Sequence, residues 1–443
     1  MSDDPNWRTA RLDELCDINP PKLALARVAE NTEVLFVPMA SVDEISGTVA
    51  RREVSTVGLV GRKSYRSFAP GDVLFAKITP CMENGKAAIV PPIPSGLGFG
   101  STEFHVLRPK PGTDARLIWH FVRQQAFRDE AAQHFTGTVG QLRVPADFLR
   151  SCEALVPVSP QDQADLATLL DEAVGTTASA STHLSCARAA VERFRRAVLA
   201  AACSGRLTAD WSGEGASAVS PLLVSTASPG LADEWGLPPN WVVARIADIG
   251  AVQLGGTPSR KRADYWTGGV RWVSSGEVAN GRIASTRESV SDLGLANSSA
   301  KVYPIGTVLI AMIGEGKTRG QAAILDIEAA TNQNAAGILA DRRFVNPEYL
   351  WRWALAEYAT TRAAGTGGNQ PALNKRRIAD LTVPVPPLDE QTEIVRRVDE
   401  LLQLADAVRS RIDGASHRLE HVSQAVLMKA FRGELLPNET DIA

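Results

Sequence analysis

Three short segments in the second half of the chain combine residue types that suit contact with nucleic acid. The first runs Gly255-Gly256-Thr257-Pro258-Ser259-Arg260-Lys261-Arg262, so that three cations stand on a loop punctuated by glycine and proline. Arginine and lysine bind phosphates or guanine, and asparagine and glutamine can pair with adenine through two hydrogen bonds. We therefore expect DNA contacts from Thr257, Ser259, Arg260, Lys261, Arg262, Lys317, Arg319, Asn369, Gln370, Asn374 and Lys375.

The first half of the chain carries a weaker version of the same signal. Residues 241–386 hold 17 Lys and Arg against 12 Asp and Glu, residues 6–160 hold 18 against 16, and residues 209–240 hold none against 4. The overall net charge of −3 therefore hides two basic blocks that could face phosphate. For any single cation a solvated surface is the simpler explanation. As a set, we expect DNA contacts here from Arg51, Arg52, Arg62, Lys63, Lys77, Lys86 and Gln141.

Some segments of the sequence resemble catalytic motifs but lack residues that those motifs require. Gly314-Glu315-Gly316-Lys317-Thr318 ends like a phosphate-binding loop, but Ala311 stands where that loop requires its first glycine. His417 and His421 lie one helical turn apart and could chelate a metal, but a solvated helix face beside the apolar stripe is the better explanation. We expect no catalytic residue, no metal and no cofactor in this chain.

The cysteines and the hydropathy of the sequence indicate the cellular compartment in which we expect this protein. The five cysteines are scattered and never form a CxxC pair, which suits a reducing cytoplasm. There is no run of 18 uncharged apolar residues and no apolar leader at the N-terminus, so we expect neither a membrane span nor a secretory signal.

The chain is a tandem repeat. The run GDVLFAKI from Gly71 recurs as GTVLIAMI from Gly306, and Trp7 and Trp119 recur as Trp241 and Trp351. The order of such matches never breaks, and their offset drifts only between 228 and 235 residues. Two copies of one unit explain this better than chance does.

Each repeat begins with a mixed globular lobe. Short apolar runs bounded by Gly, Pro or Asn predict strands. They lie at 34–37, 73–78 and 87–90, and again at 271–273, 308–313 and 322–325. Apolar residues three and four apart predict helices over 115–134 and 347–363. The lobes are therefore expected to be α+β.

Each repeat ends with one long helix that carries an apolar stripe. Steps of four and three residues continue through both helices, a 3.5-residue period that specifies a left-handed coiled-coil seam. Packing of each helix on its own lobe is the alternative. The seam residues include Leu166, Leu170, Leu184, Val191, Phe194 and Val198 in the first helix, and Ile394, Val398, Leu401, Val408, Ile412, Leu419, Val422 and Val426 in the second.

The expected order is lobe, helix, linker, lobe, helix. The lobes occupy 1–160 and 237–386, the helices 161–208 and 387–437, and a Ser-, Ala-, Gly- and Pro-rich linker 209–236. This linker is long enough for the second helix to return antiparallel to the first. The result would be a pseudo-twofold rod of about 50 Å with a lobe at each end.

Several motifs together resemble those of type I restriction-modification specificity subunits, over nearly the whole chain. The matching segments are Leu237-Pro238-Pro239-Asn240-Trp241, Gly255-Gly256-Thr257-Pro258, Thr331-Asn332-Gln333-Asn334, Leu373-Asn374, Val383-Pro384-Val385-Pro386-Pro387-Leu388 with Glu390-Gln391, and Lys429-Ala430-Phe431-Arg432-Gly433-Glu434-Leu435. The first repeat departs from the pattern. It has Ser159-Pro160-Gln161-Asp162-Gln163 at the helix start and lacks the GGTP element, which suggests a different recognition lobe with the same role.

The resemblance implies two target recognition domains, each reading one half of a bipartite double-stranded DNA target, with the helices setting the gap between the halves. It also implies two modification subunits that methylate adenine and, where the system also cleaves DNA, two restriction subunits. S-adenosylmethionine, ATP and Mg²⁺ would reside on those partners. Two readings from other classes remain open: a coiled-coil scaffold that binds no DNA, and a nucleotide-dependent enzyme that uses Lys317.

Overall fold

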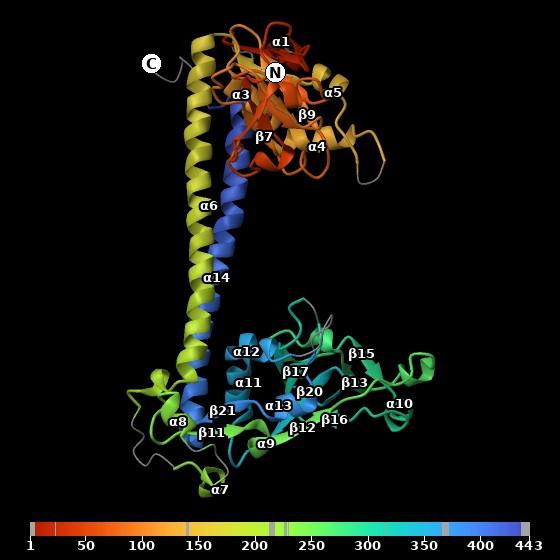
Figure 1. Ribbon diagram of the computed structural model, residues 1–443, viewed down its shortest axis with the longest axis vertical. Helices are drawn as coiled ribbons and strands as arrows, with labels where there is room; N and C mark the ends of the chain where they lie inside the picture. The colour runs from red at the N-terminus through yellow and green to blue at the C-terminus, as the bar shows by residue number, and fades with distance from the viewer. Residues whose placement is uncertain are drawn as a thin grey trace. The chain divides into compact units, whose positions relative to one another are not determined.

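The computed structural model of the chain describes residues 5–22, 24–138, 141–211, 218–225, 228, 230–314, 316–365 and 372–435. These residues form two compact units. Unit 1 comprises Met1–Ala187 and Ile412–Ala443, and unit 2 comprises Arg188–Arg411. Each unit holds one lobe, the beginning of one long helix and the end of the other, as the colours of Figure 1 allow the reader to follow.

Lobe 1 is built from two four-stranded sheets and a two-stranded ribbon. The sheets have the strand orders β2-β9-β6-β7 and β4-β3-β8-β5, and β1 pairs with β10. The strands are β1 Trp7–Arg11, β2 Cys16–Ile18, β3 Glu33–Val37, β4 Glu53–Thr56, β5 Arg66–Phe68, β6 Val73–Ala76, β7 Ala87–Ile89, β8 Gly98–Gly100, β9 Phe104–Pro109 and β10 Glu153–Pro157. The helices are α1 Leu12–Leu15, α2 Val57–Val60, α3 Ala115–Val122, α4 Gln125–Gln133, α5 Ala146–Ser151 and the 3-10 turn η1 Met39–Ser41.

Lobe 2 repeats this plan. Its sheets have the orders β12-β20-β17-β18-β14 and β15-β13-β19-β16, and β11 pairs with β21. The strands are β11 Val242–Arg245, β12 Gly250–Leu254, β13 Val270–Val273, β14 Arg282–Ile283, β15 Glu288–Val290, β16 Val302–Tyr303, β17 Val308–Ala311, β18 Ala322–Leu325, β19 Ala329–Thr331, β20 Ala335–Ala340 and β21 Thr382–Val385. The helices are α9 Ile246–Ile249, α10 Asp292–Ala296, α11 Pro347–Ala356, α12 Tyr358–Ala363 and α13 Lys375–Ala379, with 3-10 turns η3 Ala263–Tyr265 and η4 Ser275–Glu277.

The two long helices are α6 Pro160–Ala202 and α14 Leu388–Ala430. Pro160 stands in the first turn of α6, and α14 starts directly after Pro386-Pro387, as the proline signals indicated. The α+β class with a long helix after each lobe is confirmed. Between α6 and lobe 2 lie η2 Arg206–Thr208, α7 Pro221–Val224 and α8 Leu231–Glu234, and Leu223 of α7 is buried in the core of unit 2.

The predicted strands are confirmed, but each predicted lobe helix is divided in two. The segment 115–134 forms α3 and α4 with Gln124 extended between them, and 347–363 forms α11 and α12 with a break at Glu357. The apolar spacing continues through the first break, because Phe127 and Ala131 still reach the core. No glycine or proline marks either break, so the sequence carried no signal for it.

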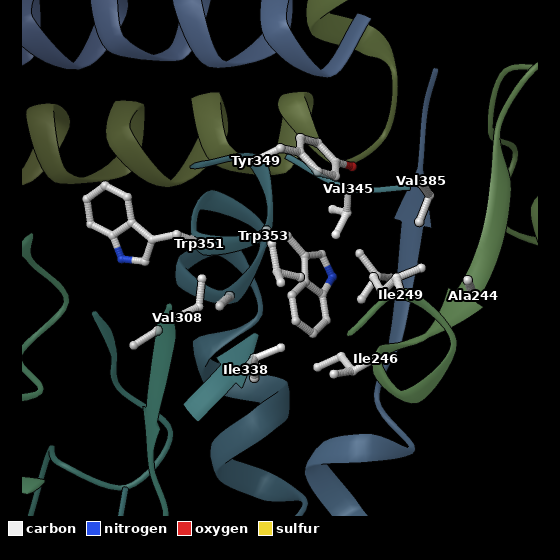
Figure 2. Close-up of a cluster of buried hydrophobic side chains, with 14 of the residues drawn as sticks. Ala244, Ile246, Ile249, Val308, Ile338, Val345, Tyr349, Trp351, Trp353 and Val385 are labelled. Carbon is white, nitrogen blue, oxygen red and sulfur yellow. The ribbon is translucent and has the colours of Figure 1, made fainter. Parts of the chain in front are cut away.

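The core of each lobe lies between its sheets and the first of these paired helices. In unit 2 one face of α11 carries Tyr349 and Trp353, which pack with β17, β20 and the ribbon strands around Ile246 (Figure 2). Tyr349 donates a hydrogen bond from its hydroxyl to the Pro384 carbonyl at 2.6 Å. Its polar end is thereby satisfied inside an apolar core.

The ribbon closes each lobe against both long helices. In unit 1 Trp7 on β1 packs with Leu166 and Leu170 of α6 and with Leu427 and Ala430 of α14. In unit 2 Trp241, directly before β11, packs in one core with Val198 and Ala202 of α6 and with Ile394 and Val398 of α14. Each lobe is thus completed by the end of the helix that belongs to the other repeat.

The helices run antiparallel where they pair. In unit 2 Arg195 forms an ion pair with Asp406, and Glu192, one turn earlier, pairs with Arg409, one turn later, at 3.2 Å. The stripe residues are buried at both ends of α6 and near the start of α14. Phe194, Val408 and Val422, which the heptad pattern also places in the seam, are 40%, 38% and 53% exposed. Leu184, Leu401, Leu419 and Val426 are half-buried, and Val191 and Ile412 are buried.

Candidate nucleic-acid interface

Three segments that are far apart in sequence meet at the end of β17 in lobe 2. The amide of Met312, the first residue after β17, donates to the carbonyl of Asn334 at 2.8 Å. The amide of Leu373 donates in turn to the carbonyl of Met312 at 2.9 Å. We call residues 312–314, 332–334 and 372–374 the lobe 2 junction.

Lobe 1 contains the same arrangement with different side chains. The amide of Lys77, after β6, donates to the Glu103 carbonyl at 2.9 Å, and the Val144 amide donates to the Lys77 carbonyl at 2.9 Å. We call residues 77–79, 101–103 and 141–144 the lobe 1 junction. The repeat therefore preserves the backbone at this point, while Lys77 and Glu103 stand where lobe 2 has Met312 and Asn334.

The lobe 1 junction concentrates positive charge around one carboxylate. Glu103 accepts two hydrogen bonds from Arg143, at 2.8 and 3.0 Å, and this contact holds its pKa below the usual range. Burial lowers the pKa of Lys77, and the positive charges of Arg66 and Arg143 lower it further, although Glu103 opposes them. One acid therefore balances three cations, and the remaining positive charge suits a phosphate.

The other expected lobe 1 residues divide between this junction and the rest of the lobe. Gln141 is exposed in the junction, and its carbonyl accepts from Arg143 at 2.8 Å. Lys86 lies beside Lys77 at the end of the β6–β7 hairpin, where its carbonyl accepts from the Ala76 amide at 2.9 Å. Sequence reasoning missed Arg66 and Arg143. Arg143 has no other cation close to it in the sequence, whereas Arg66 follows Arg62 and Lys63 by a few residues, and that cluster could have pointed to it.

The remaining cations of lobe 1 are placed by the second sheet. Arg51 and Arg52 directly precede β4, and Arg62 and Lys63 precede β5, which forms the opposite edge. Arg62 pairs with Glu30 at 2.7 Å, and Arg51 approaches Glu53 at 3.9 Å. The strand order therefore separates Arg51 and Arg52 from the edge that carries Arg66.

In lobe 2 the glycine-rich loop, residues 255–262, packs against the segment 331–333 at the junction. The Gly256 amide donates to the Thr331 carbonyl at 2.8 Å, and the Thr257 hydroxyl lies 2.6 Å from Oε1 of Gln333. A Cβ on Gly255 would lie 2.1 Å from the Thr331 carbonyl oxygen, so the loop can approach this closely only with glycine there. Gln333, which the sequence indicates only as part of the segment Thr331-Asn332-Gln333-Asn334, lies exposed beside Thr257.

The three cations of this loop have different environments. Arg260 binds Glu288 through Nη1 and Nη2, and its guanidinium carbon lies over Trp266, 3.5 Å from the ring centre. Arg262 pairs with Asp264 at 2.6 Å. Lys261 is exposed and forms no ion pair with any described residue. The Ser259 carbonyl accepts from the Trp266 indole at 3.2 Å, which fixes the loop that presents Lys261.

Further cations surround the junction of lobe 2. Lys317 is exposed, and its carbonyl accepts from the Tyr358 hydroxyl at 2.7 Å. Arg319 is half-buried against Gly365. Asn374 caps α13, because its Oδ1 accepts from the Arg377 amide at 2.9 Å, and Lys375 is the exposed first residue of that helix. Asn369 and Gln370 lie outside the described residues.

The side chains of both junctions are of types that bind phosphates and bases. They present ammonium, guanidinium and amide groups around carbonyl-fixed loops. Within the described part of the chain, no group of three or more His, Cys, Asp or Glu side chains could hold a metal ion. No helix in that part is long and apolar enough to cross a lipid bilayer.

Comparison with known proteins assigns the family. Residues 238–413 match the type I restriction modification DNA specificity domain. The EcoEI specificity subunit of Escherichia coli is 22% identical over 95% of this chain and 82% of its own length, and the StySPI specificity subunit of Salmonella potsdam is 26% identical over 84% and 76%. The chain belongs to the family of type I restriction-modification specificity subunits.

Solved structures agree on the fold of this specificity subunit. A chain from a study of assembly of a type I restriction-modification system has a TM-score of 0.76 at 19% identity, over 98% of this chain and 99% of its own. The HsdS subunit from Thermoanaerobacter tengcongensis has a TM-score of 0.57 at 18% identity, over 97% and 98%. The EcoDI specificity subunit of Escherichia coli matches at 26% identity, over 62% of this chain and 61% of its own length. The expectation of a non-catalytic specificity subunit is confirmed by the family.

Proposed function

We propose that this chain selects the DNA target of a type I restriction-modification complex, each lobe reading one half of a bipartite sequence. The observation that carries the proposal is the pair of junctions, which share their backbone hydrogen bonds and differ in their side chains. A common framework with variable loop residues is what two recognition modules for unlike sequences require, since bases are read by side chains and the frame only positions them.

The two junctions would read by different chemistry. Lobe 1 offers Lys77, Arg143 and Arg66 around Glu103, a cationic surface suited to phosphate and guanine. Lobe 2 offers Gln333 beside Thr257. Lys261, in the same loop as Thr257, and Lys317, in the loop after β17, are both exposed. A glutamine amide can both accept from and donate to adenine, and the flanking lysines suit phosphates.

The long helices would set the gap between the half-sites and dock the partner subunits. Phe194, Val408 and Val422 stay exposed on them and are apolar positions that docked subunits would cover. Two modification subunits would supply S-adenosylmethionine and methylate adenine, and a restricting system would add two restriction subunits that use ATP and Mg²⁺. The complex would act on duplex DNA in the cytoplasm.

The test is a genome-wide map of methylated adenines in the host with and without this gene. A split motif with two unlike halves and a fixed gap should lose methylation on deletion. Chromosomal Gln333→Ala and Lys77→Ala variants should each relax only one half of that motif. Identical maps with and without the gene would instead favour a scaffold that binds no DNA.

A further inference from the structure

A cavity of about 460 Å³ lies within unit 1, where lobe 1 meets α6 and α14. Its walls come from the loop before β4, from α3 and α4, and from both long helices. Glu44, Trp119, Arg123 and Arg128 line it from the lobe, Ala178 from α6 and Gln424 from α14. None of these residues belongs to the lobe 1 junction, so the cavity needs its own explanation.

Two arginines face this cavity without an acidic partner. Arg123 donates from Nη2 to the carbonyls of Glu44 at 3.1 Å and Ile45 at 2.7 Å, and its guanidinium lies 4.6 Å from the centre of the Trp119 ring. Arg128 donates to the Arg123 carbonyl and to Oε1 of Gln125. Every acceptor is neutral, and no described carboxylate forms an ion pair with either guanidinium.

The positive charge at this point is therefore uncompensated. Burial lowers the pKa of Arg123 to about 10, and the neighbouring Arg128 adds to that effect. Nη1 of Arg123 and Nε of Arg128 are buried and have no acceptor among the described residues. Buried donors of this kind are uncommon, and they leave the arginine pair without a hydrogen-bonded counter-charge, which an anion in the cavity would supply electrostatically.

The nearby acids do not fill this role. Asp43 acts on Arg123 only at longer range, and its Oδ1 accepts from the Ile45 and Ser46 amides. Asp129 acts on Arg128 in the same way and accepts from Nε2 of Gln125 at 2.7 Å. Glu44 and Glu420 also line the cavity, but both are exposed, so water and salt screen them.

The backbone is shaped to admit both arginines. Gly47 and Gly85 have positive φ angles of 61° and 72°. A Cβ on Gly47 would lie 1.3 Å from Nη1 of Arg123, and one on Gly85 would lie 2.7 Å from Nη1 of Arg128. Larger residues would push the guanidinium groups away, so two separate turns are built around this pair.

The feature is confined to one repeat. The offset that relates Trp119 to Trp351 places Leu355 and Thr360 at the positions of Arg123 and Arg128. The backbone framework that both lobes share therefore does not require the arginine pair, because lobe 2 forms the same helices without it. We propose that this cavity is a binding site for a small oxyanion, such as phosphate or a carboxylate, that bridges lobe 1 and the helix pair.

The test is calorimetric titration of the full chain, at constant ionic strength and without DNA, with inorganic phosphate, sulfate and malonate as separate probes. Saturable binding of one anion per chain is expected, and comparison of the three probes distinguishes phosphate-like ligands from carboxylates. Arg128→Gln should weaken that binding at least about tenfold, because a charge-assisted contact is lost, while Arg128→Lys should retain part of it. Arg8→Gln is the matched control, since Arg8 is exposed on β1 of the same lobe and its loss changes the net charge equally.

A second variant separates loss of the site from loss of the fold. Ala178→Phe fills the cavity from α6 and leaves both arginines unchanged, so it should abolish binding while the unfolding midpoint stays close to that of the parent. Equal weakening by Arg8→Gln and Arg128→Gln, or no saturable binding at all, would overturn the proposal. Displacement of bound phosphate by duplex DNA would also overturn it, because the arginines would then be part of a DNA surface. The proposed DNA recognition is measured separately and survives any of these results.

Discussion

The cationic side chains of the glycine-rich loop in lobe 2 have two different roles: some hold the loop in place, and one is available to contact DNA. Arg260 is neutralised by Glu288 and stacked on Trp266, so its charge is already engaged. Lys261, between two paired arginines, keeps its charge for a ligand. The loop therefore combines a fixed platform with one exposed cation at its tip.

This difference predicts distinct effects on DNA binding by the assembled complex. Lys261→Ala should weaken binding equally for all sequences and reduce the slope of log affinity against log salt by about 1, because one phosphate contact is lost. Arg260→Ala should instead reduce the base specificity of one half-site, since the loop loses the contacts of Arg260 with Trp266 and Glu288. Competition assays with single-base variants of the target, over a salt series, distinguish the two. Base-specific relaxation by Lys261→Ala would contradict the assignment.

A buried histidine beneath the lobe 1 junction makes stability depend on pH. His105 lies 2.9 Å from the Asn19 amide through Nδ1 and 2.8 Å from the Val144 carbonyl through Nε2, and burial lowers its pKa from 6.5 to about 4. As pH falls below 6.5, the unfolded chain takes up a proton that the folded chain refuses. Folding is therefore progressively disfavoured down to about pH 4, by an amount on the order of 3 kcal/mol.

His105→Gln should remove this part of the acid sensitivity. Urea unfolding of both proteins between pH 7 and pH 4 measures it, and the difference in slope between them matters more than either absolute stability. Parallel curves for the parent and the variant would show that His105 does not titrate in this window.

At the scale of helices and strands, the two repeats match closely in the turns that end α6 and α14, which we call the joints. Gly205 after α6 has a φ of 73° and Gly433 after α14 has a φ of 75°, and a Cβ at either would lie 3.6 or 3.4 Å from the ring of Trp241 or Trp7. Both helices therefore end in the same left-handed turn against the tryptophan that opens a repeat.

Replacement of these glycines tests the joints. Alanine at a positive φ costs about 1–2 kcal/mol wherever it stands. Gly71→Ala, at φ 86° with open space around its Cβ, should show that cost alone. Gly433→Ala should be similar, whereas Gly205→Ala should cost more because its Cβ would lie 2.3 Å from Pro238. Urea denaturation gives the three values, and an equal loss for Gly71→Ala and Gly205→Ala would deny that the contact with Pro238 matters.

The sequence revealed the elements better than their meeting points. Periodicity predicted β6, β17 and the long helices because burial imposes a regular spacing on each of them. It could not show the breaks at Gln124 and Glu357, which no special residue marks. It also missed Arg143, because a single cation gains meaning only when the chain folds it against Glu103.

At the scale of the whole molecule, each compact unit is completed by a segment from the other repeat. The end of α14 covers Trp7, Leu166 and Leu170 in unit 1, as the end of α6 covers the corresponding surface in unit 2. Neither repeat alone can bury its opening tryptophan in this way.

A chain shortened to residues 1–208 should therefore self-associate. Its exposed joint lacks Leu427 and Ala430, but the end of its own α6 is the counterpart of that segment and can be supplied by a second copy. Light scattering after size-exclusion chromatography should report a dimer. Addition of a separately produced 209–443 fragment should convert it into a one-to-one complex. A stable monomer would contradict the role given to these contacts.

The proposed spacing role of the helices predicts a change in target length. Insertion of one heptad into both α6 and α14 preserves the 3.5-residue register of the stripe. Methylation should then occur at a motif with unchanged halves and a longer gap, or cease altogether. Sequencing of methylated DNA decides this, and an unaltered motif would remove the helices from any part in setting the gap.

The exchange of helix ends also sets an order of events during synthesis. Domains commonly fold as they leave the ribosome, the first before the second. Here lobe 1 is made first, yet its contact between Trp7 and Ala430 waits until almost the whole chain has emerged. Unit 2 comprises Arg188–Arg411 and has all its parts earlier. The later-made half of this protein is thus the one that can finish first, and the earlier-made half stays open until translation reaches the end of α14.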